Sequence, residues 1–405
     1  MALFRSLRNR PFALLWSGQT VSRLGDSLNR IAMMWWVVEQ TGSAAAMGTV
    51  AIFSLAPMLL FLLVGGVAVD RFSRARIMLL SDIGRGLLMC AVAALAYLNR
   101  LEVWHIYAAA FVFGFVDAFF TPAYTALVPA VVPQNDLPSA NSLTNLSWQI
   151  TGVGGPAIGA FIVALGGTPL AFGLDALSFF ISAALLVPLL PLSPAPKAEA
   201  GAPKPNALAE LGEGFRLVLA EPWLWITILV FGITNAADAS PFSVALPFLI
   251  KDTYHLQVGA LGAVQSLFSA GSVAGALWLG RLPRLRRRGL VGYGVTILAG
   301  LCTLSFGLPI TIYGIGLAAF VRGIGYATFG LIWTNTLQEM VPGDKLGRVS
   351  SIDWLGSLIA MPVGFALAGW ATDLIGPPLV FVVGGSITVL MVLLALLHPR
   401  IRRLD

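Results

Sequence analysis

The stretch GGVAVDRFSRARIM, residues 65–78, ends one long apolar run and begins the next. Between the two runs it carries one aspartate and three arginines, Asp70, Arg71, Arg74 and Arg76. Charge is rare elsewhere, because 57% of the 405 residues are hydrophobic and only 11% are charged, whereas about 25% of the residues of soluble domains are charged. A short charged segment between two such runs therefore predicts a turn that joins two membrane-spanning helices.

Apolar runs of this kind recur along the whole chain, and each is long enough to cross the roughly 30 Å hydrocarbon core of a bilayer as a helix. A large soluble protein with many buried helices would need polar helix faces, which these runs lack. The sequence thus predicts an all-α membrane protein. Its twelve expected spans are 12–38, 45–68, 75–98, 104–128, 142–166, 169–191, 223–249, 258–280, 289–308, 312–337, 351–372 and 376–398.

The positive charges predict the orientation of these spans, because Lys and Arg concentrate in cytoplasmic loops. With both termini placed in the cytoplasm, the outer side holds only Arg100 and Lys251. The net charge of +6 then reflects membrane topology and does not indicate binding to nucleic acid. The cytoplasmic side holds 19 basic residues: Arg5, Arg8, Arg10, Arg71, Arg74, Arg76, Lys197, Lys204, Arg216, Arg281, Arg284, Arg286, Arg287, Arg288, Lys345, Arg348, Arg400, Arg402 and Arg403.

The chain also divides into two similar halves. Residues 192–221 are rich in Pro, Ala and Lys, which is typical of a flexible linker, and end in a short amphipathic piece. They separate six expected helices in 1–191 from six in 222–405. AFVFGF at 110–115 returns as AFVRGI at 319–324, and the three arginines at 71, 74 and 76 return at 281, 284 and 286. Six-helix halves repeated in parallel predict a transporter with its substrate path between them.

These motifs resemble those of the major facilitator superfamily over the full length of the chain. GVAVDRFSRAR is similar to the signature Gly-x-x-x-Asp-Arg-x-Gly-Arg-Arg/Lys of its loop 2–3, with departures at Ser73 and Ala75. TGVGGPAIGA, 151–160, resembles the fifth-helix antiporter signature, with departures at Thr151 and Ala160. The stretches 12–28 and 121–143 are similar to drug:proton antiporters, a subgroup that includes macrolide-efflux and siderophore-export proteins.

The resemblance assigns roles to both motifs. In the loop between helices 2 and 3, Asp70 is expected to act as a gate latch that accepts bonds from the start of helix 11, near Ser350 and Ser351. The gating motif comprises Gly66, Asp70, Arg71, Arg74 and Arg76. In the fifth helix, the small-residue ridge permits close helix packing and Pro156 can bend the helix. The resemblance implies that this motif, Gly155, Pro156 and Gly159, limits leak.

Ionisable residues inside spans are costly and usually face a cavity or a partner. In the first helix Gln19, Arg23, Asp26 and Arg30 follow one another at spacings of 4, 3 and 4, so they share one face. Asp26 is a candidate for carrying a proton. Since Arg23 and Arg30 lie one turn away on either side, an ion-paired structural or gating role fits it equally well.

Asp117 has no basic residue within one turn, and Tyr124 shares its face, so it is the first candidate for proton coupling. The alternative is an ion pair with Arg85 or Arg322 elsewhere in the bundle. Asp238, beside Asn235, ranks second.

Two further charged residues complete the set of candidates. Asp175, in the sixth helix, is assigned a structural role. Arg322 could bind an anionic group or hold an aspartate ionised. In the predicted core, four aspartates balance four arginines, so the sequence favours neither a cationic nor an anionic substrate: Asp26, Asp117, Asp175 and Asp238 against Arg23, Arg30, Arg85 and Arg322.

The leading hypothesis is efflux of an amphiphilic, drug-like molecule by alternating access coupled to proton influx. The alternative is a dedicated exporter of a siderophore, another secreted metabolite or a lipid. No G-x-x-x-x-G-K-[ST] loop and no metal-ligand spacing occurs, so neither ATP, a metal nor enzymatic chemistry is predicted, and the proton motive force is the expected energy source. We expect a monomer in a prokaryotic inner membrane whose partners are a small-molecule substrate and the lipid bilayer.

Overall fold

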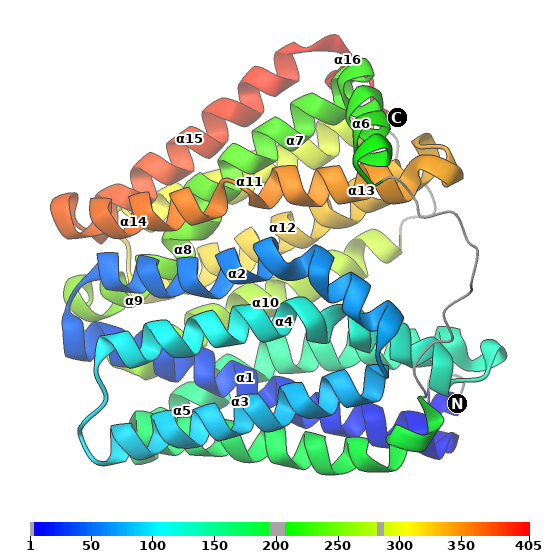
Figure 1. Ribbon diagram of the computed structural model, residues 1–405. Coiled ribbons are helices and arrows are strands. Elements are labelled where there is room, and N and C mark those ends of the chain that lie inside the picture. Colours follow the sequence, from blue (N-terminus) through cyan, green and yellow to red (C-terminus); the bar gives the residue numbers. More distant parts are fainter. Residues whose placement is uncertain (1–3, 194–206, 282–286) are drawn as a thin grey trace. The chain divides into compact units, whose positions relative to one another are not determined.

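The structure is a computed structural model that describes residues 4–193, 207–281 and 287–405, and every regular element in these residues is a helix (Figure 1). The chain divides into two compact units. Unit 1 comprises Met1–Gly42, Thr49–Ala200 and Gln257–Gly262, and unit 2 comprises Ser43–Gly48, Gly201–Leu256 and Ala263–Asp405.

Unit 1 is built on long helices joined by short turns. Three short 3₁₀ segments accompany them, η1 (Arg5–Arg8), η2 (Gln134–Asp136) and η3 (Val187–Leu192). The long helices are α1 (Arg10–Thr41), α2 (Ala44–Arg71), whose first residues belong to unit 2, α3 (Arg74–Tyr97), α4 (Val103–Val131) and α5 (Leu137–Leu186).

The helix α5 is two helices joined at a sharp break. Gly167 has φ 72° and ψ −179°, a backbone conformation that is open essentially only to glycine. Pro169 follows and lacks the N–H that would continue the hydrogen-bond ladder. The break therefore lies between the two spans predicted at 142–166 and 169–191.

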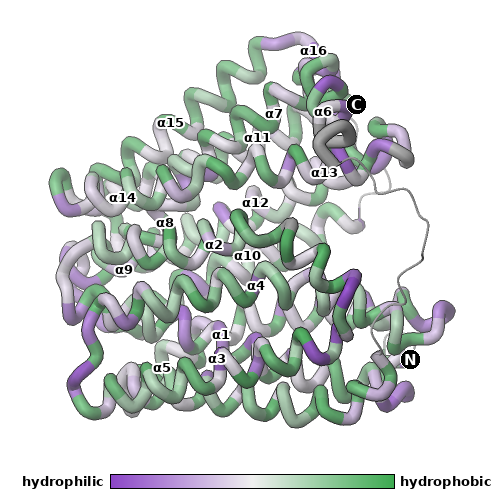
Figure 2. Tube along the Cα trace, viewed as in Figure 1, coloured by the Kyte–Doolittle hydropathy of each residue, from purple (hydrophilic) through white to green (hydrophobic). Residues whose placement is uncertain are grey.

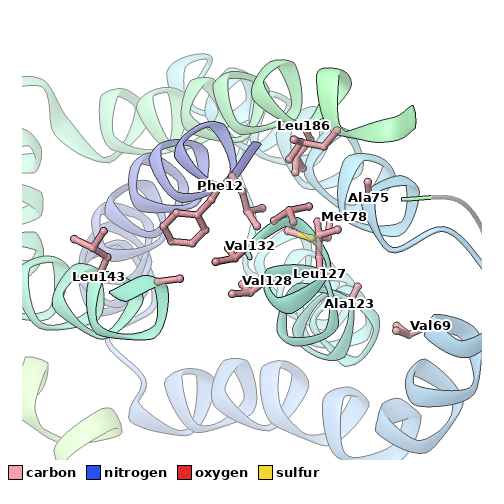
Figure 3. Packing of buried hydrophobic residues seen from close by; sticks show 14 residues of the cluster. Phe12, Val69, Ala75, Met78, Ala123, Leu127, Val128, Val132, Leu143 and Leu186 are labelled. Atoms are coloured by element: carbon pink, nitrogen blue, oxygen red, sulfur yellow. The ribbon is translucent and has the colours of Figure 1, made fainter. Parts of the chain in front are cut away.

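The core of unit 1 is a cluster of buried apolar side chains from its five long helices, with Val69 contributed by α2. Phe12 of α1, Met78 of α3 and Leu127 of α4 are fully buried, and Leu186 of α5 closes the cluster. Figure 3 shows Phe12, Val132 and Val128 lying close together between their helices. These contacts hold α1, α3, α4 and α5 together at the end of the unit where the 65–78 turn lies.

Unit 2 consists of shorter helical pieces. The segment predicted as the span 223–249 contains one π-helical turn at 235–239, and a second one at 249–253 begins at its last residue; such turns are frequent at functional sites. Its core joins Trp223 of α7, Tyr293 of α11 and Val392 of α15. The helices are α6 (Ala207–Ala220), α7 (Pro222–Thr234), η4 (Asn235–Ala239), α8 (Ser240–Val244), α9 (Leu246–Phe248), η5 (Leu249–Thr253), α10 (Val258–Gly280), whose first turn belongs to unit 1, α11 (Arg288–Ser305), α12 (Ile312–Met340), α13 (Gly343–Leu358), α14 (Met361–Ile375), α15 (Pro377–Leu397) and α16 (Pro399–Arg402).

Among the described residues, ten helical segments are long and apolar enough to cross a membrane. Figure 2 shows long hydrophobic stretches with hydrophilic residues gathered near the helix ends and connections. One of the ten, Gln134–Leu192, contains two of the predicted spans. The predicted first span corresponds to α1, which is 32 residues long but is not among the ten because Arg23, Asp26 and Arg30 lie along it.

Two parts of the sequence predictions concern residues outside the described ranges. The predicted linker 192–221 is described only at Leu192, Ser193 and from Ala207 onward, where the amphipathic piece forms α6. Of the second arginine motif, Arg281 is described, whereas Arg284 and Arg286 lie outside the described residues.

Candidate functional site

A chain of polar contacts runs through the interior of unit 1 and centres on Arg85 of α3. The Arg85 guanidinium is buried and donates from Nη2 to Asp82 Oδ1 (2.7 Å) and from Nη1 to Asp117 Oδ1 of α4 (3.2 Å). Ser182 of α5 donates to the other oxygen of Asp82 (2.7 Å), and Gln19 of α1 donates to Ser182 (3.0 Å). Four helices thus meet at one network, whose members are neighbours in space but not in sequence.

The two carboxylates bound to Arg85 differ in exposure. Asp82 is completely buried, while 41% of the Asp117 side chain is accessible. Two aromatic rings, those of Phe120 and Phe179, lie 4.3 and 4.6 Å from the guanidinium carbon of Arg85 and so confine it further. Asp117 is therefore the accessible end of the network, where a proton could be exchanged.

The charged stripe of α1 does not form the local ion pairs expected from its spacing. Arg23 stacks over the rings of Trp148 (4.4 Å) and Tyr124 (5.1 Å) and points a guanidinium nitrogen at the carbonyl oxygen of Thr144 (3.5 Å). Arg30 is exposed. Within the described residues no salt bridge closer than 4 Å joins either arginine to Asp26, which is half-buried.

Tyr124 also belongs to this edge of unit 1. Its hydroxyl shares a hydrogen bond with Thr144 Oγ1 at 3.2 Å, so α4 and the first part of α5 are joined beside Arg23. Aromatic faces attract a guanidinium group, so the two rings hold Arg23 in place. The predicted candidates Arg23 and Tyr124 are thus brought together, whereas Arg30 lies apart from them.

Unit 2 holds a second buried arginine. Arg322 of α12 donates from Nη2 to Asp238 Oδ2 (2.6 Å) and from Nε to Thr303 Oγ1 of α11 (3.0 Å), and Thr303 in turn donates to Asp238. The rings of Phe242 and Phe268 lie 4.3 and 5.0 Å from its guanidinium carbon. Each unit therefore contains one arginine bound to carboxylate and flanked by two phenylalanines.

The acidic partner of Arg322 lies on an irregular helix. Asp238 is within the π-helical turn η4, and so is Asn235, whose side-chain amide donates to the carbonyl oxygen of Ser357 in α13 (3.0 Å). A π-helical turn adds a residue to the helix and so redirects the side chains around it. Asp238 and Arg322, both selected from the sequence, are thus brought together, and Asn235 serves as a neighbouring helix contact.

The 65–78 stretch forms the end of α2 and the start of α3. Ser73, where the superfamily signature has glycine, is the N-cap of α3 and accepts a hydrogen bond from the Arg76 N–H (3.4 Å). Arg74 donates to the carbonyl oxygen of Ala126 in α4 (3.0 Å). Asp70, Arg71 and Arg76 are exposed, and Gly66 has open space around it.

The fifth-helix motif packs against α1. A Cβ on Gly155 would lie 2.3 Å from Ser27 Oγ, and one on Gly159 would lie 3.2 Å from the Leu28 Cα atom. Larger side chains would therefore push α1 away from α5. Pro156, between the two glycines, is buried in the same contact.

A family-wide sequence pattern covers most of the chain. The sequence profile of the Major Facilitator Superfamily matches residues 15–354. The chain belongs to the Major Facilitator Superfamily. It is therefore a multi-pass membrane transporter of the secondary, non-enzymatic kind.

Relatives within the superfamily include export proteins. The chain is 24% identical over 396 residues to macrolide efflux protein A of Streptococcus pyogenes, with 97% of each chain covered. It is 28% identical over 400 residues to the enterobactin exporter EntS of Escherichia coli O1:K1 / APEC, with 98% of this chain and 94% of the relative covered.

Solved structures share the fold at low identity. A POT family transporter in complex with a thioalcohol-conjugated peptide gives a TM-score of 0.75 at 13% identity, covering 96% of each chain. A bacterial homologue of the iron transporter ferroportin in an inward-facing state gives 0.70 at 16% identity, covering 96% of this chain and 98% of the other. These likenesses concern the fold alone.

Sequence reasoning missed Asp82, Ser182 and Thr303. The i, i+3 spacing of Asp82 and Arg85 is a readable signal, because it places both side chains on one face of α3. Ser182 and Thr303 give no such signal, because small hydroxyl residues occur throughout membrane helices and only the tertiary contacts single them out.

Proposed function

We propose that this transporter exports an amphiphilic small molecule by alternating access and that inward proton flow drives the export. The observation that carries the proposal is the Arg85 network, in which a buried arginine is shared between buried Asp82 and partly exposed Asp117. In this network the exposed carboxylate of Asp117 can bind a proton, and the ion pair between Asp117 and Arg85 would then weaken.

Proton binding at Asp117 would couple to transport through the two orientations of the protein. Proton binding shifts the equilibrium between the two orientations only if Asp117 binds the proton more tightly in one orientation than in the other. In the orientation where Asp117 keeps its bond to Arg85, the proton is held weakly. In the other, where that bond is lost, the neutral acid is favoured. Asp238 and Arg322 form the corresponding candidate pair in unit 2.

The relatives support export as the direction and suggest two substrate classes. The macrolide efflux protein favours drug-like amphiphiles. The enterobactin exporter favours the second candidate, a dedicated exporter of a siderophore or similar secreted metabolite. The basic residues of the predicted loops support cytoplasmic termini, and the bacterial relatives support the inner membrane as location. We keep Asp70 and its neighbouring arginines as the proposed cytoplasmic gate.

The proposal is tested in inside-out membrane vesicles energised by a pH gradient, with macrolides, fluorescent dyes and enterobactin as probes. We expect uptake of at least one probe, collapse of that uptake by an uncoupler, and its loss in Asp117→Asn. The matched control is Asp136→Asn, since Asp136 pairs at the surface with the exposed Arg5. Proton-driven uptake at the wild-type rate in Asp117→Asn would remove Asp117 from the coupling, and uptake insensitive to the uncoupler would refute proton drive.

A further inference from the structure

Asp175, in the second part of α5, is a buried acid without a partner. Its accessible surface is 0%, and neither carboxyl oxygen has a hydrogen-bond donor. Within the described residues it is the only acidic side chain for which both oxygens are buried and unpartnered.

The carboxyl group of Asp175 lies where α5 packs closely against α1. Asp175 faces α1 at Gly25, and a Cβ placed on Gly25 would lie 2.6 Å from Asp175 Oδ1 and 2.0 Å from Ser178 Oγ. Ser178, whose hydroxyl donates to the main-chain carbonyl oxygen of Asp175 (2.7 Å), is the polar side chain beside the carboxyl group.

The charged groups around Asp175 do not supply a free cation. Arg85 acts on it by charge, but both of its terminal nitrogens already donate, to Asp82 and to Asp117. Asp26 of α1 is the other group that acts on it, and its charge has the same sign. The acidic, basic and histidine side chains on the helices around this site are Arg10, Arg23, Asp26, Arg30 and Glu39 of α1, Arg74, Arg76, Asp82 and Arg85 of α3, and His105 and Asp117 of α4.

An ionised carboxylate in this position would carry the full cost of burial. Removing a carboxylate from water without a donor or counter-ion is far more costly than burying the neutral acid. The neutral acid has a hydrogen of its own, and the oxygen of Ser178 lies beside it as an acceptor. Four carboxyl groups around the single buried Arg85 also favour one of them being neutral.

From these contacts we infer that Asp175 is a proton-binding residue whose bound proton holds α1 against α5 at Gly25. When the proton leaves, the carboxylate needs water or a donor, and both require α1 to move away from α5. The role of this movement in transport rests on the proposed function. The presence of a bound proton on Asp175 is inferred independently of that function.

Infrared spectroscopy of the purified full-length protein at neutral pH tests the bound proton directly. The wild-type protein should show the C=O stretching band of a protonated carboxyl group, and Asp175→Asn should remove it. The matched variant Asp82→Asn should instead remove a carboxylate band, because Arg85 and Ser182 donate to the two oxygens of Asp82 and so favour its ionised form. Absence of the protonated band from the wild-type protein, which needs no variant, would overturn the inference. So would its persistence in Asp175→Asn.

Hydrogen exchange of the α1 amides tests the mechanical consequence. After correction for the intrinsic pH dependence of exchange, the wild-type protein should lose protection around Gly25 as the pH rises. Asp175→Asn, which mimics the neutral acid, should keep it. Equal loss of protection in both proteins would overturn the link between the proton and the α1–α5 contact.

The transport assay then separates this inference from the proposed function. If Asp175→Asn lacks the infrared band and keeps α1 protected, the inference holds even in a protein that exports none of the probes. If wild-type export is proton-driven and the band is absent, the proposed function stands and the inference fails.

Discussion

Replacing Arg85 by leucine should destabilise unit 1 more than any other single substitution of a charged residue in it. The substitution leaves buried Asp82 without its counter-ion and removes the bond to Asp117. Breaking a buried ion pair by removing one partner costs about 3–5 kcal/mol. Losing the contacts with Phe120 and Phe179 adds about 0.5–1 kcal/mol each, so we expect a loss of about 4–7 kcal/mol.

The size of this loss can be separated into its parts with two further variants. Asp82→Asn should cost less, about 1–3 kcal/mol, because the amide oxygen can still accept a hydrogen bond and Arg85 keeps Asp117. In the double variant Arg85→Leu/Asp82→Asn no charge at Asp82 is left unpaired, so it should be more stable than Arg85→Leu alone.

Thermal unfolding of the purified protein in detergent, followed by tryptophan fluorescence, gives the ranking. We expect the midpoint to fall most in Arg85→Leu, less in the double variant and least in Asp82→Asn. An Arg85→Leu protein as stable as the wild type would refute the reasoning, and so would a double variant whose loss equals the sum of the two single losses.

Three further substitutions test other contacts. Gly155→Leu should abolish transport and lower the unfolding midpoint by forcing α1 from α5, while Gly154→Ala, which meets no atom closer than 3.8 Å, should behave as wild type in both assays. Asp238→Asn should reach the membrane in normal amounts, measured by surface labelling, but lose export, because Arg322 loses its only ion pair among the described residues; normal export would argue against a role for this pair. Ser73→Ala should lower stability by about 1 kcal/mol through loss of the α3 cap, with no change in export per folded molecule.

Much of the fold could be predicted because a helix that crosses a membrane needs a long apolar run, and such runs are visible in the sequence. Hydropathy predicts a span less clearly where the span carries charged residues or where no polar loop separates it from the next span. Helix α1 carries Arg23, Asp26 and Arg30 along a span of 32 residues, and α5 passes through Gly167 without an intervening polar loop. The π-helical turns at 235–239 and 249–253 have no sequence signal, because they depend on how neighbouring helices pack.

The candidate site could be predicted only in part, because its residues contact partners that lie far away in the sequence. Spacing identifies residues on one helix face, and so it selected Asp26, Asp117 and Asp238. It cannot assign partners that are 65 or 84 residues away, as Thr303 and Arg322 are from Asp238.

The same limit applies to contacts between helices. The stacking of Arg23 on aromatic rings supplied by other helices could not be read from its spacing to Asp26. The complete burial of Asp175 is likewise visible only in three dimensions.

The central claim, that proton entry drives export, is tested most directly by running the cycle backwards. Proteoliposomes containing the protein and a pH indicator are given a substrate gradient and no initial pH gradient. The account predicts that substrate flow in one direction creates a pH gradient by proton flow in the other, and that Asp117→Asn abolishes this proton flow. Substrate movement without any change of luminal pH in the wild-type protein would contradict the account.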